Sequence, residues 1–439
     1  MSENINKQFY NYLWAYILVA LSGCLGNVVD GIIVGNLINE DGVSAINLSK
    51  PINQFIFTLH LLINAGAGML VAYALGKQNI TDARRFFTRA LTFSVGLGVL
   101  LAIVGGMLFP AETARLLCSN NQILPLARDY MQVLLLGNPA FILMWGLSTM
   151  VGVDGQPKLV SVAVIIDNVV NLCLDVVFIQ WFGWGITGSS AATVVGHLVG
   201  IIILLSHWHH HKRLQLDLSM VNGKCSMVKI ISQGAPLAVA SISLTLLLLS
   251  ANTIVLSTMG RTGIFAFAVC MNLLQVYNLF LSGTCQTLQS LGAIQVGKGN
   301  VEGLRVVLRK AFRFITIAMF VTCLFVWIDP QAIAVLFGAN EPDMIHETDH
   351  ALRIFALSFI PFCYIYTIMI VYKLYSHHKM ALFISFALSL TVIPVLWIVA
   401  KTAPQMLWYS YLIAYIIEIL LIVLFHKMSR IQFLLPTLN

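Results

Sequence analysis

Charged residues are scarce in this chain of 439 residues: Asp, Glu, Lys and Arg make up 10% of it, while 59% of the residues are hydrophobic. A soluble domain has about 25% charged residues. The scarcity therefore excludes an ordinary soluble fold and indicates an all-α integral membrane protein. The net charge of +7 does not favour nucleic acid as a partner, because the basic residues lie in short segments between apolar runs rather than in one patch.

Several chemical patterns are also missing. The eight cysteines are scattered without a CxxC pair, so the sequence predicts neither a disulfide framework nor a zinc site. No GxxxxGK(S/T) segment is present, which argues against direct coupling to ATP. The first apolar run is too long for a cleavable signal peptide, lacks a basic leading segment and contains Asp30. We expect no cofactor other than a coupling ion.

Twelve apolar runs are long enough to cross a bilayer, for which a helix needs about 20 residues. With the N-terminus inside, only six of the 25 Lys and Arg fall in outer segments, and this bias supports twelve transmembrane helices with both termini cytoplasmic. The expected spans are 11–37, 45–75, 88–110, 123–149, 158–181, 186–206, 229–258, 262–296, 312–337, 349–372, 380–400 and 405–426.

An internal repeat divides these spans into two groups of six. The segment Gly76–Asn79 recurs as Gly297–Asn300 at an offset of 221 residues, and Pro139 and Pro361 lie near the same offset. Such repeats are characteristic of transporter folds, in which the solute site lies between the halves. We expect two pseudo-symmetric six-helix bundles, an N-lobe with the cation site and a C-lobe, joined by a cytoplasmic linker. The N-lobe, linker and C-lobe are expected over 1–206, 207–228 and 229–439.

One apolar run, Lys158–Trp181, carries the polar residues Asp167, Asn171 and Asp175. Their spacing of four places them on one face of a helix. A carboxylate at the centre of a spanning helix costs roughly 2.5–3.5 kcal/mol. Two of them indicate a bundle interior or a wet cavity that binds a proton, an ion or a charged solute. A buried polar network that only fixes helix packing is the alternative.

The expected topology places further polar groups at the same depth. Asp30, Asp175 and Thr193 all lie about six or seven residues from the outer ends of their helices, roughly 10 Å below the outer surface. Asn171 lies one turn deeper. Two carboxylates, an amide and a hydroxyl suit a hard cation such as Na⁺, or a proton shared between coupled acids. No basic residue lies at that depth in the first half.

With these residues in view, the chain resembles the MATE (multidrug and toxic compound extrusion) family. Val28–Gly35 is similar to the family's acidic motif in helix 1, and Gly155–Lys158 followed by Asn171–Asp175 is similar to its helix 4–5 motif. Gly76-Lys77 resembles its helix 2–3 loop, and Gln286–Gly299 the matching stretch of the second half. The resemblance covers essentially the whole chain, and the motifs occur in the order of the family. The resemblance implies a proton- or Na⁺-coupling site at Asp30, Asn171, Asp175 and Thr193.

The sequence departs from the family pattern in three places. Residues 11–37 contain no proline, although many relatives have one in helix 1. Val151 and Gly152 stand where a basic residue is usual. Residues 229–258 contain no Asp or Glu, whereas some members have an acidic residue there. Coupling is therefore expected to depend on the N-lobe.

Other polar features have weaker interpretations. The histidines of His207–His211 are expected to form an interfacial basic cap, because adjacent residues do not converge on a metal as His at i and i+4 would. Glu418 either lines a C-lobe cavity or reaches the inner surface. Residues expected to support the site or to contact solute are Asp167, Asn27, Met271, Gln275, Gln286 and Glu418.

These observations predict a secondary antiporter, not an enzyme, that exports amphipathic and often cationic organic compounds in exchange for H⁺ or Na⁺. We expect a monomer in a bacterial plasma membrane, with small molecules and membrane lipids as its partners. One alternative is a flippase for a lipid-linked precursor, but the spans hold almost no Lys or Arg to bind a pyrophosphate. An intramembrane enzyme is a further alternative and would need a nucleophile or metal constellation.

Overall fold

The computed structural model describes residues 2–38, 40–116, 123–210, 213–220 and 227–428. Within them the fold is all-helical, with no strands. The chain divides into two compact units. We call Tyr10–Gly234 the N-terminal unit, and Met1–Phe9 together with Ala235–Asn439 the C-terminal unit.

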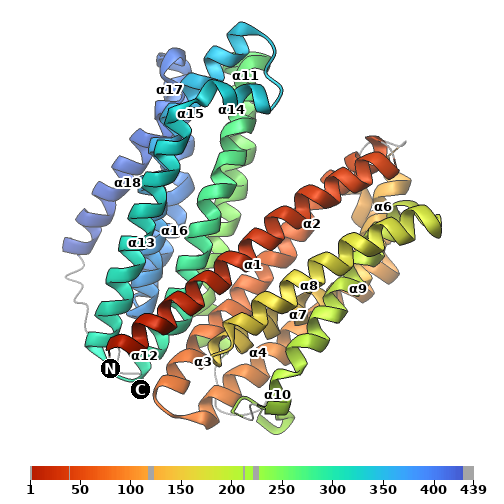
Figure 1. The fold of residues 1–439 in the computed structure, drawn as a ribbon, viewed down its shortest axis with the longest axis vertical. Helices are drawn as coiled ribbons and strands as arrows, with labels where there is room; N and C mark the ends of the chain where they lie inside the picture. The colour runs from red at the N-terminus through yellow and green to blue at the C-terminus, as the bar shows by residue number, and fades with distance from the viewer. Residues whose placement is uncertain (1, 39, 117–122, 211–212, 221–226, 429–439) are drawn as a thin grey trace. The chain divides into compact units, whose positions relative to one another are not determined.

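The N-terminal unit is built from α-helices with π-helical turns (η1–η3) and a short 3-10 helix (η4) in the same chain order (Figure 1). Its elements are α1 (Ser2–Leu37), α2 (Glu40–His60), η1 (Leu61–Ala65), α3 (Gly66–Gly76), α4 (Ile80–Leu101), η2 (Ala102–Leu108), α5 (Pro110–Arg115), α6 (Leu124–Leu136), α7 (Asn138–Val153), α8 (Pro157–Val176), η3 (Val177–Trp181), α9 (Gly185–Leu205), α10 (His207–His210) and η4 (Leu218–Met220). Residues 2–9 of α1 belong to the C-terminal unit.

Apart from Met1–Phe9, the C-terminal unit begins inside a helix of 61 residues. Its elements are α11 (Met227–Thr287), η5 (Leu288–Gly292), α12 (Ala293–Gly297), α13 (Val301–Ile328), α14 (Pro330–Leu336), α15 (Pro342–Leu374), α16 (His378–Leu390), α17 (Val392–Thr402), η6 (Pro404–Met406) and α18 (Tyr409–Met428). The first residues of α11, up to Gly234, belong to the N-terminal unit.

Ten helices in the described part of the chain are long and apolar enough to cross a membrane. The number rises to eleven if α6 and α7, bent by 49° with respect to each other, form one span. α11 is counted once, although its backbone leaves the helical region at Gly260, with φ 63° and ψ −147°. The all-helical membrane fold is confirmed, and the count of twelve stays a prediction.

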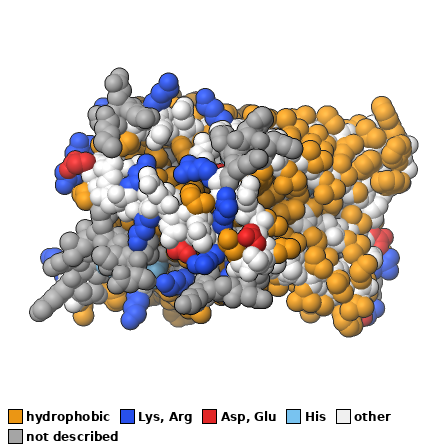
Figure 2. Space-filling model, turned by 90° about the horizontal axis from the view of Figure 1, so that it is seen from below, with side chains coloured by type: hydrophobic (Ala, Val, Ile, Leu, Met, Phe, Trp, Pro, Cys, Tyr) orange, Lys and Arg blue, Asp and Glu red, His pale blue; other side chains and the backbone are white. Residues whose placement is uncertain are grey.

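The surfaces of the helices are apolar, as expected for a protein in lipid. On α13 alone, Phe320 and Phe325 are 65% and 69% exposed. In Figure 2, Lys and Arg side chains gather in one part of the face shown, and a broad area of the same face is made almost entirely of hydrophobic side chains. Exposed apolar area on this scale marks contact with membrane or partner, and here it follows the spanning helices.

The internal repeat corresponds to the same local structure in both units. α3 ends at Gly76 and α12 at Gly297, and both are followed by a residue with positive φ, Gln78 (60°) or Gly299 (65°). The next residue is an asparagine, whose side chain accepts a hydrogen bond from a backbone N–H in the first turn of α4 (Asp82, 3.1 Å) or α13 (Gly303, 2.9 Å). Asparagine is among the best residues for this capping position.

Candidate functional site

Polar side chains meet along the line where α8 packs against α9 in the N-terminal unit. The two helices run in opposite directions, so each step of one turn raises the residue number on one and lowers it on the other. The facing pairs are Asp175 with Ser189, Asn171 with Thr193, and Asp167 with His197. We call these three pairs the polar seam.

Glycines on α9 bring the two backbones close together at the seam. A Cβ atom on Gly196 would lie 2.6 Å from Asp167 Oδ1 and 2.8 Å from its backbone oxygen. A Cβ atom on Gly200 would lie 2.6 Å from the methyl carbon of Met144 on α7. Small residues at helix contacts allow such an approach in membranes, and here they make room for the carboxyl group of Asp167.

The outer pair of the seam is joined by a carboxyl group from α1. Asp30 and Asp175 interact electrostatically with each other, and both lie close to the hydroxyl group of Ser189. Asp175 is fully buried. Asp30 Oδ1, both carboxyl oxygens of Asp175 and Ser189 Oγ have no hydrogen-bond partner among the described atoms.

No basic side chain of the described residues forms an ion pair with either acid. Two carboxylates close together in a medium of low dielectric repel each other, and burying an unpaired ionised carboxylate is expensive. Asp30 and Asp175 therefore form a site that a proton or a small cation would stabilise.

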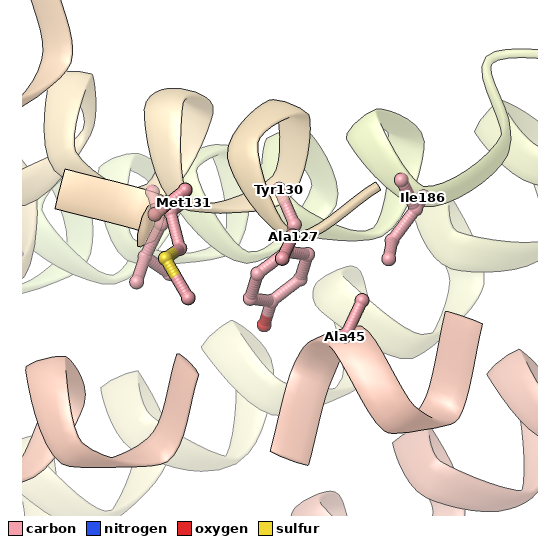
Figure 3. Close-up of a cluster of buried hydrophobic side chains, with 7 residues drawn as sticks. Ala45, Ala127, Tyr130, Met131 and Ile186 are labelled. Atoms are coloured by element: carbon pink, nitrogen blue, oxygen red, sulfur yellow. The ribbon is translucent and has the colours of Figure 1, made fainter. Parts of the chain in front are cut away.

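Tyr130 on α6 adds a hydroxyl group that the sequence did not reveal. Its ring projects from α6 toward the helix that carries Ala45, α2, within a cluster of buried hydrophobic side chains that also contains Ile186 of α9 (Figure 3). Tyr130 interacts electrostatically with both Asp30 and Asp175. A depth argument could have found it, because Tyr130 lies six residues into α6, level with the two acids on their own helices.

The middle pair of the seam contains the remaining two residues of the predicted site. Asn171 Nδ2 donates to Thr193 Oγ1 at 3.1 Å, and Thr193 Oγ1 donates in turn to the backbone oxygen of Ser189 at 3.2 Å. The structure thus brings together Asp30 with Asp175, and Asn171 with Thr193. The two pairs lie on successive turns of α8.

The inner pair of the seam, Asp167 and His197, was only half visible in the sequence. His197 Nδ1 lies 2.9 Å and 3.1 Å from the two carboxyl oxygens of Asp167. Their side chains are only 8% and 14% exposed, and the edge of the Phe141 ring packs against the imidazole. His197 lies one turn beyond Thr193, so the register of the seam could have identified it.

The other candidate residues lie elsewhere. Met271, Gln275 and Gln286 lie on α11 in the C-terminal unit, where Gln286 Nε2 donates to Ser282 Oγ at 3.2 Å. The side chain of Asn27 lies outside the described part of the structure.

Glu418 of α18 is fully buried in the C-terminal unit rather than extended toward a surface. Neither carboxyl oxygen has a hydrogen-bond partner among the described atoms. We expect Glu418→Met, which keeps a similar volume without the carboxyl group, to stabilise the purified protein by about 1–4 kcal/mol. The measurement is the thermal unfolding midpoint in detergent.

A matched control is Glu302→Met, which removes an exposed glutamate paired with Arg305 at 2.7 Å. Exposed ion pairs contribute about 0–1 kcal/mol, so this variant should hardly change the midpoint. A lower midpoint for Glu418→Met would show that the buried carboxyl group has a stabilising partner.

The expectation for the histidine tract is wrong at His207. His207 Nε2 lies 2.9 Å from Asp154 Oδ2, and both side chains are 1% exposed. Arg213 Nε lies 4.0 Å from the other carboxyl oxygen. His207 therefore lies in a buried contact with Asp154 at the end of α7, not in an interfacial cap, while the side chains of residues 209–211 lie outside the described structure.

Comparison with known families gives one match over most of the chain. The profile of the MatE family matches residues 16–177 and 236–398. Each unit therefore contains one copy of the matched domain.

Curated relatives match over part of their length. YoeA of Bacillus subtilis, a probable multidrug resistance protein, is 26% identical over 235 residues, which are 52% of this chain and 50% of YoeA. The multidrug export protein MepA of Staphylococcus haemolyticus is 22% identical over 63% of this chain and 62% of MepA. The chain thus spans about half to somewhat under two thirds of the relatives it matches.

Solved structures match over nearly the whole chain. The MATE transporter VcmN of Vibrio cholerae has a TM-score of 0.87 and 19% sequence identity, and covers 98% of this chain and 97% of its own. A multidrug resistance MATE family transporter in an outward-facing conformation has a TM-score of 0.86 at 18% identity, covering 97% and 96%. At such identity the similarity establishes the fold.

Proposed function

The chain belongs to the MatE family, and we propose that it is an antiporter which exports amphipathic, often cationic organic compounds in exchange for H⁺ or Na⁺. The names of the relatives YoeA and MepA support multidrug export as its role. An antiporter needs a site whose charge changes when the coupling ion binds. Asp30 and Asp175 supply such a site.

The single observation that carries this proposal is a pair of carboxyl groups, one fully buried and one partly buried, with which no basic side chain of the described residues forms an ion pair. Asp175 is fully buried, and Asp30 reaches it from a different helix. An entering proton or Na⁺ neutralises repulsion between α1 and α8, so the two helices pack differently with and without the ion. The free energy that drives export is the difference in ion and solute affinity between the two states.

We extend the proposal to topology and location. Twelve spans follow if α6 and α7 form one span and α11 forms two that meet at Gly260, and both termini then lie in the cytoplasm. The N-lobe and C-lobe are taken as 1–206 and 229–439, with the linker 207–228 between them. The relatives YoeA and MepA are bacterial proteins, which supports a bacterial plasma membrane. The protein would act as a monomer in lipid, without a cofactor and without enzymatic activity.

Dye transport in proteoliposomes tests the proposal. The purified chain is reconstituted with an acidic lumen in one preparation and a Na⁺-loaded lumen in another, and ethidium is added outside. We expect ethidium to accumulate under one of these gradients, which identifies the coupling ion. An ionophore that collapses the gradient, nigericin for H⁺ or monensin for Na⁺, should abolish accumulation.

Two results would contradict the proposal. Ethidium accumulation that persists after the gradient has collapsed would exclude coupling to that ion. Folded protein that moves neither ethidium nor chemically different cationic dyes under either gradient would exclude multidrug antiport, and would favour a lipid-linked substrate.

A further inference from the structure

The inner pair of the polar seam has a geometry that fixes where a proton can be added. Asp167 contacts His197 only through Nδ1, at 2.9 Å and 3.1 Å from its two oxygens. A carboxylate accepts hydrogen bonds, so Nδ1 carries a proton in both charge states of the ring. His197 Nε2 is buried and has no hydrogen-bond partner among the described atoms. Nε2 is therefore the atom at which the ring gains or loses its proton.

Burial favours the form of the pair in which Nε2 of His197 is protonated. With Nε2 unprotonated, an ionised Asp167 beside a neutral ring leaves one net negative charge inside the membrane. With Nε2 protonated, the two charges cancel at hydrogen-bonding distance. An uncompensated charge in low dielectric costs much more than a paired one. The geometry of the pair therefore gives a proton added at Nε2 a carboxylate that compensates its charge.

The surroundings of the pair contain few other titratable groups. α7, which packs on it through Phe141, has no Asp, Glu, His, Lys, Arg, Tyr or Cys between Asn138 and Val153. On the far side of Phe141 and Trp145 lies the buried ring of His60. Further titratable groups on the surrounding helices are Asp30 of α1, Tyr130 of α6 and Asp175 of α8 at the outer site, together with Cys24 of α1 and Cys173 of α8.

We propose that Asp167 and His197 form a second proton-binding station, linked to the Asp30–Asp175 site by the Asn171–Thr193 pair. Its role in transport rests on the proposed antiport, but its proton binding does not. Asp167 lies eight residues from Asp175, about 12 Å along the helix. At that distance, and at an effective dielectric of about 20, one unit charge changes the proton affinity of another group about tenfold. The two stations therefore influence each other's occupancy.

Nuclear magnetic resonance of histidine side chains tests the station without any transported solute. Protein labelled with ¹⁵N in its imidazole rings is placed in lipid nanodiscs and titrated between about pH 5 and pH 9. The signal of His197 is identified by its loss in His197→Gln. We expect Nδ1 to stay protonated throughout while Nε2 titrates. A neutral ring that carries its proton on Nε2 instead of Nδ1, or a ring that does not titrate in this range, would overturn the proposal.

Variants test both the pairing and the link. Asp167→Asn should weaken proton binding at His197 more than tenfold, because it removes the charge that compensates the imidazolium. The double variant Asp30→Asn, Asp175→Asn should weaken it about tenfold. Asn168→Ala is the control, since Asn168 bonds Ser22 of α1 instead and should leave the titration unchanged. If His197 titrates unchanged in Asp167→Asn, the proposed pairing with Asp167 is wrong. If it titrates unchanged in the double variant, the proposed link to the Asp30–Asp175 site is wrong.

Measurements of ethidium transport then distinguish a failure of this inference from a failure of the proposed function. If the antiport proposal holds, His197→Gln should change the pH profile of ethidium transport while transport itself persists. An unchanged profile would leave the station outside the transport cycle and overturn its role. If no dye is transported by the wild-type protein, the proposed function fails, whereas the titration of His197 still decides whether the station exists.

Discussion

Asp175→Asn is expected to abolish gradient-driven transport of ethidium in proteoliposomes. An asparagine keeps the shape of a protonated aspartic acid but cannot lose its proton, so the outer site would stay in one charge state. The coupling ion could then no longer shift the balance between the two states of the transporter. The measurement is the initial rate of ethidium accumulation, which should fall to the rate of liposomes without protein.

Asp30→Asn should have the same effect, because the two carboxyl groups act as one coupled site. The double variant should therefore be no worse than either single one. Both variants should elute as folded protein. Asp175→Asn should unfold at a midpoint no lower than that of the wild type, since Asp175 is fully buried and neither of its carboxyl oxygens has a hydrogen-bond partner among the described atoms.

Asp129→Asn is the matched control for this prediction. Asp129 precedes Tyr130 on α6, but its side chain is 38% exposed and pairs with Arg128 at 2.7 Å. Losing an exposed ion pair of this kind changes stability little, and transport should be unaffected. Full transport by both purified Asp30→Asn and Asp175→Asn would remove the assignment of the coupling site.

The sequence could identify the acids of the site because acids are rare in spanning helices. Asp30, Asp167 and Asp175 each carry a cost in lipid that neutral residues do not. Ser189 and Tyr130 carry no such cost, so depth alone can name them as candidates but cannot separate them from packing residues at the same level. Their role depends on which helices face each other, and a single sequence does not contain that register.

The prediction for His207 was wrong because the residue that contacts it lies far away in the sequence. Its neighbours 209–211 suggested a solvated basic tract, but the side chain that holds it, Asp154, lies 53 residues earlier. Hydropathy alone also does not fix the number of spanning helices, because it measures only the length of apolar runs. It cannot tell whether a bend such as that between α6 and α7 divides a span.

Gly234→Ala is the second large effect that we expect, and it concerns folding. Near its start, α11 passes so close to η1 that a Cβ atom on Gly234 would lie 1.9 Å from the backbone oxygen of Leu62. A backbone atom cannot move aside as the end of a flexible side chain can. The variant should therefore lose more than about 3 kcal/mol of stability. Size-exclusion chromatography of the detergent extract should show little or no monodisperse protein.

The same contact can be tested from its other side. A Cβ atom on Gly66, the first residue of α3, would lie 2.4 Å from Ile230 O and 2.7 Å from Gly234 N, so Gly66→Ala should fail in the same way. Gly96 of α4 has no atom within 4 Å of its added Cβ. There, alanine should be neutral or stabilising by up to about 1 kcal/mol, because glycine is a poor helix former. Normal yields of Gly66→Ala and Gly234→Ala would mean that the start of α11 can move away from η1, and that the backbone contact is not required for the N-terminal unit to fold.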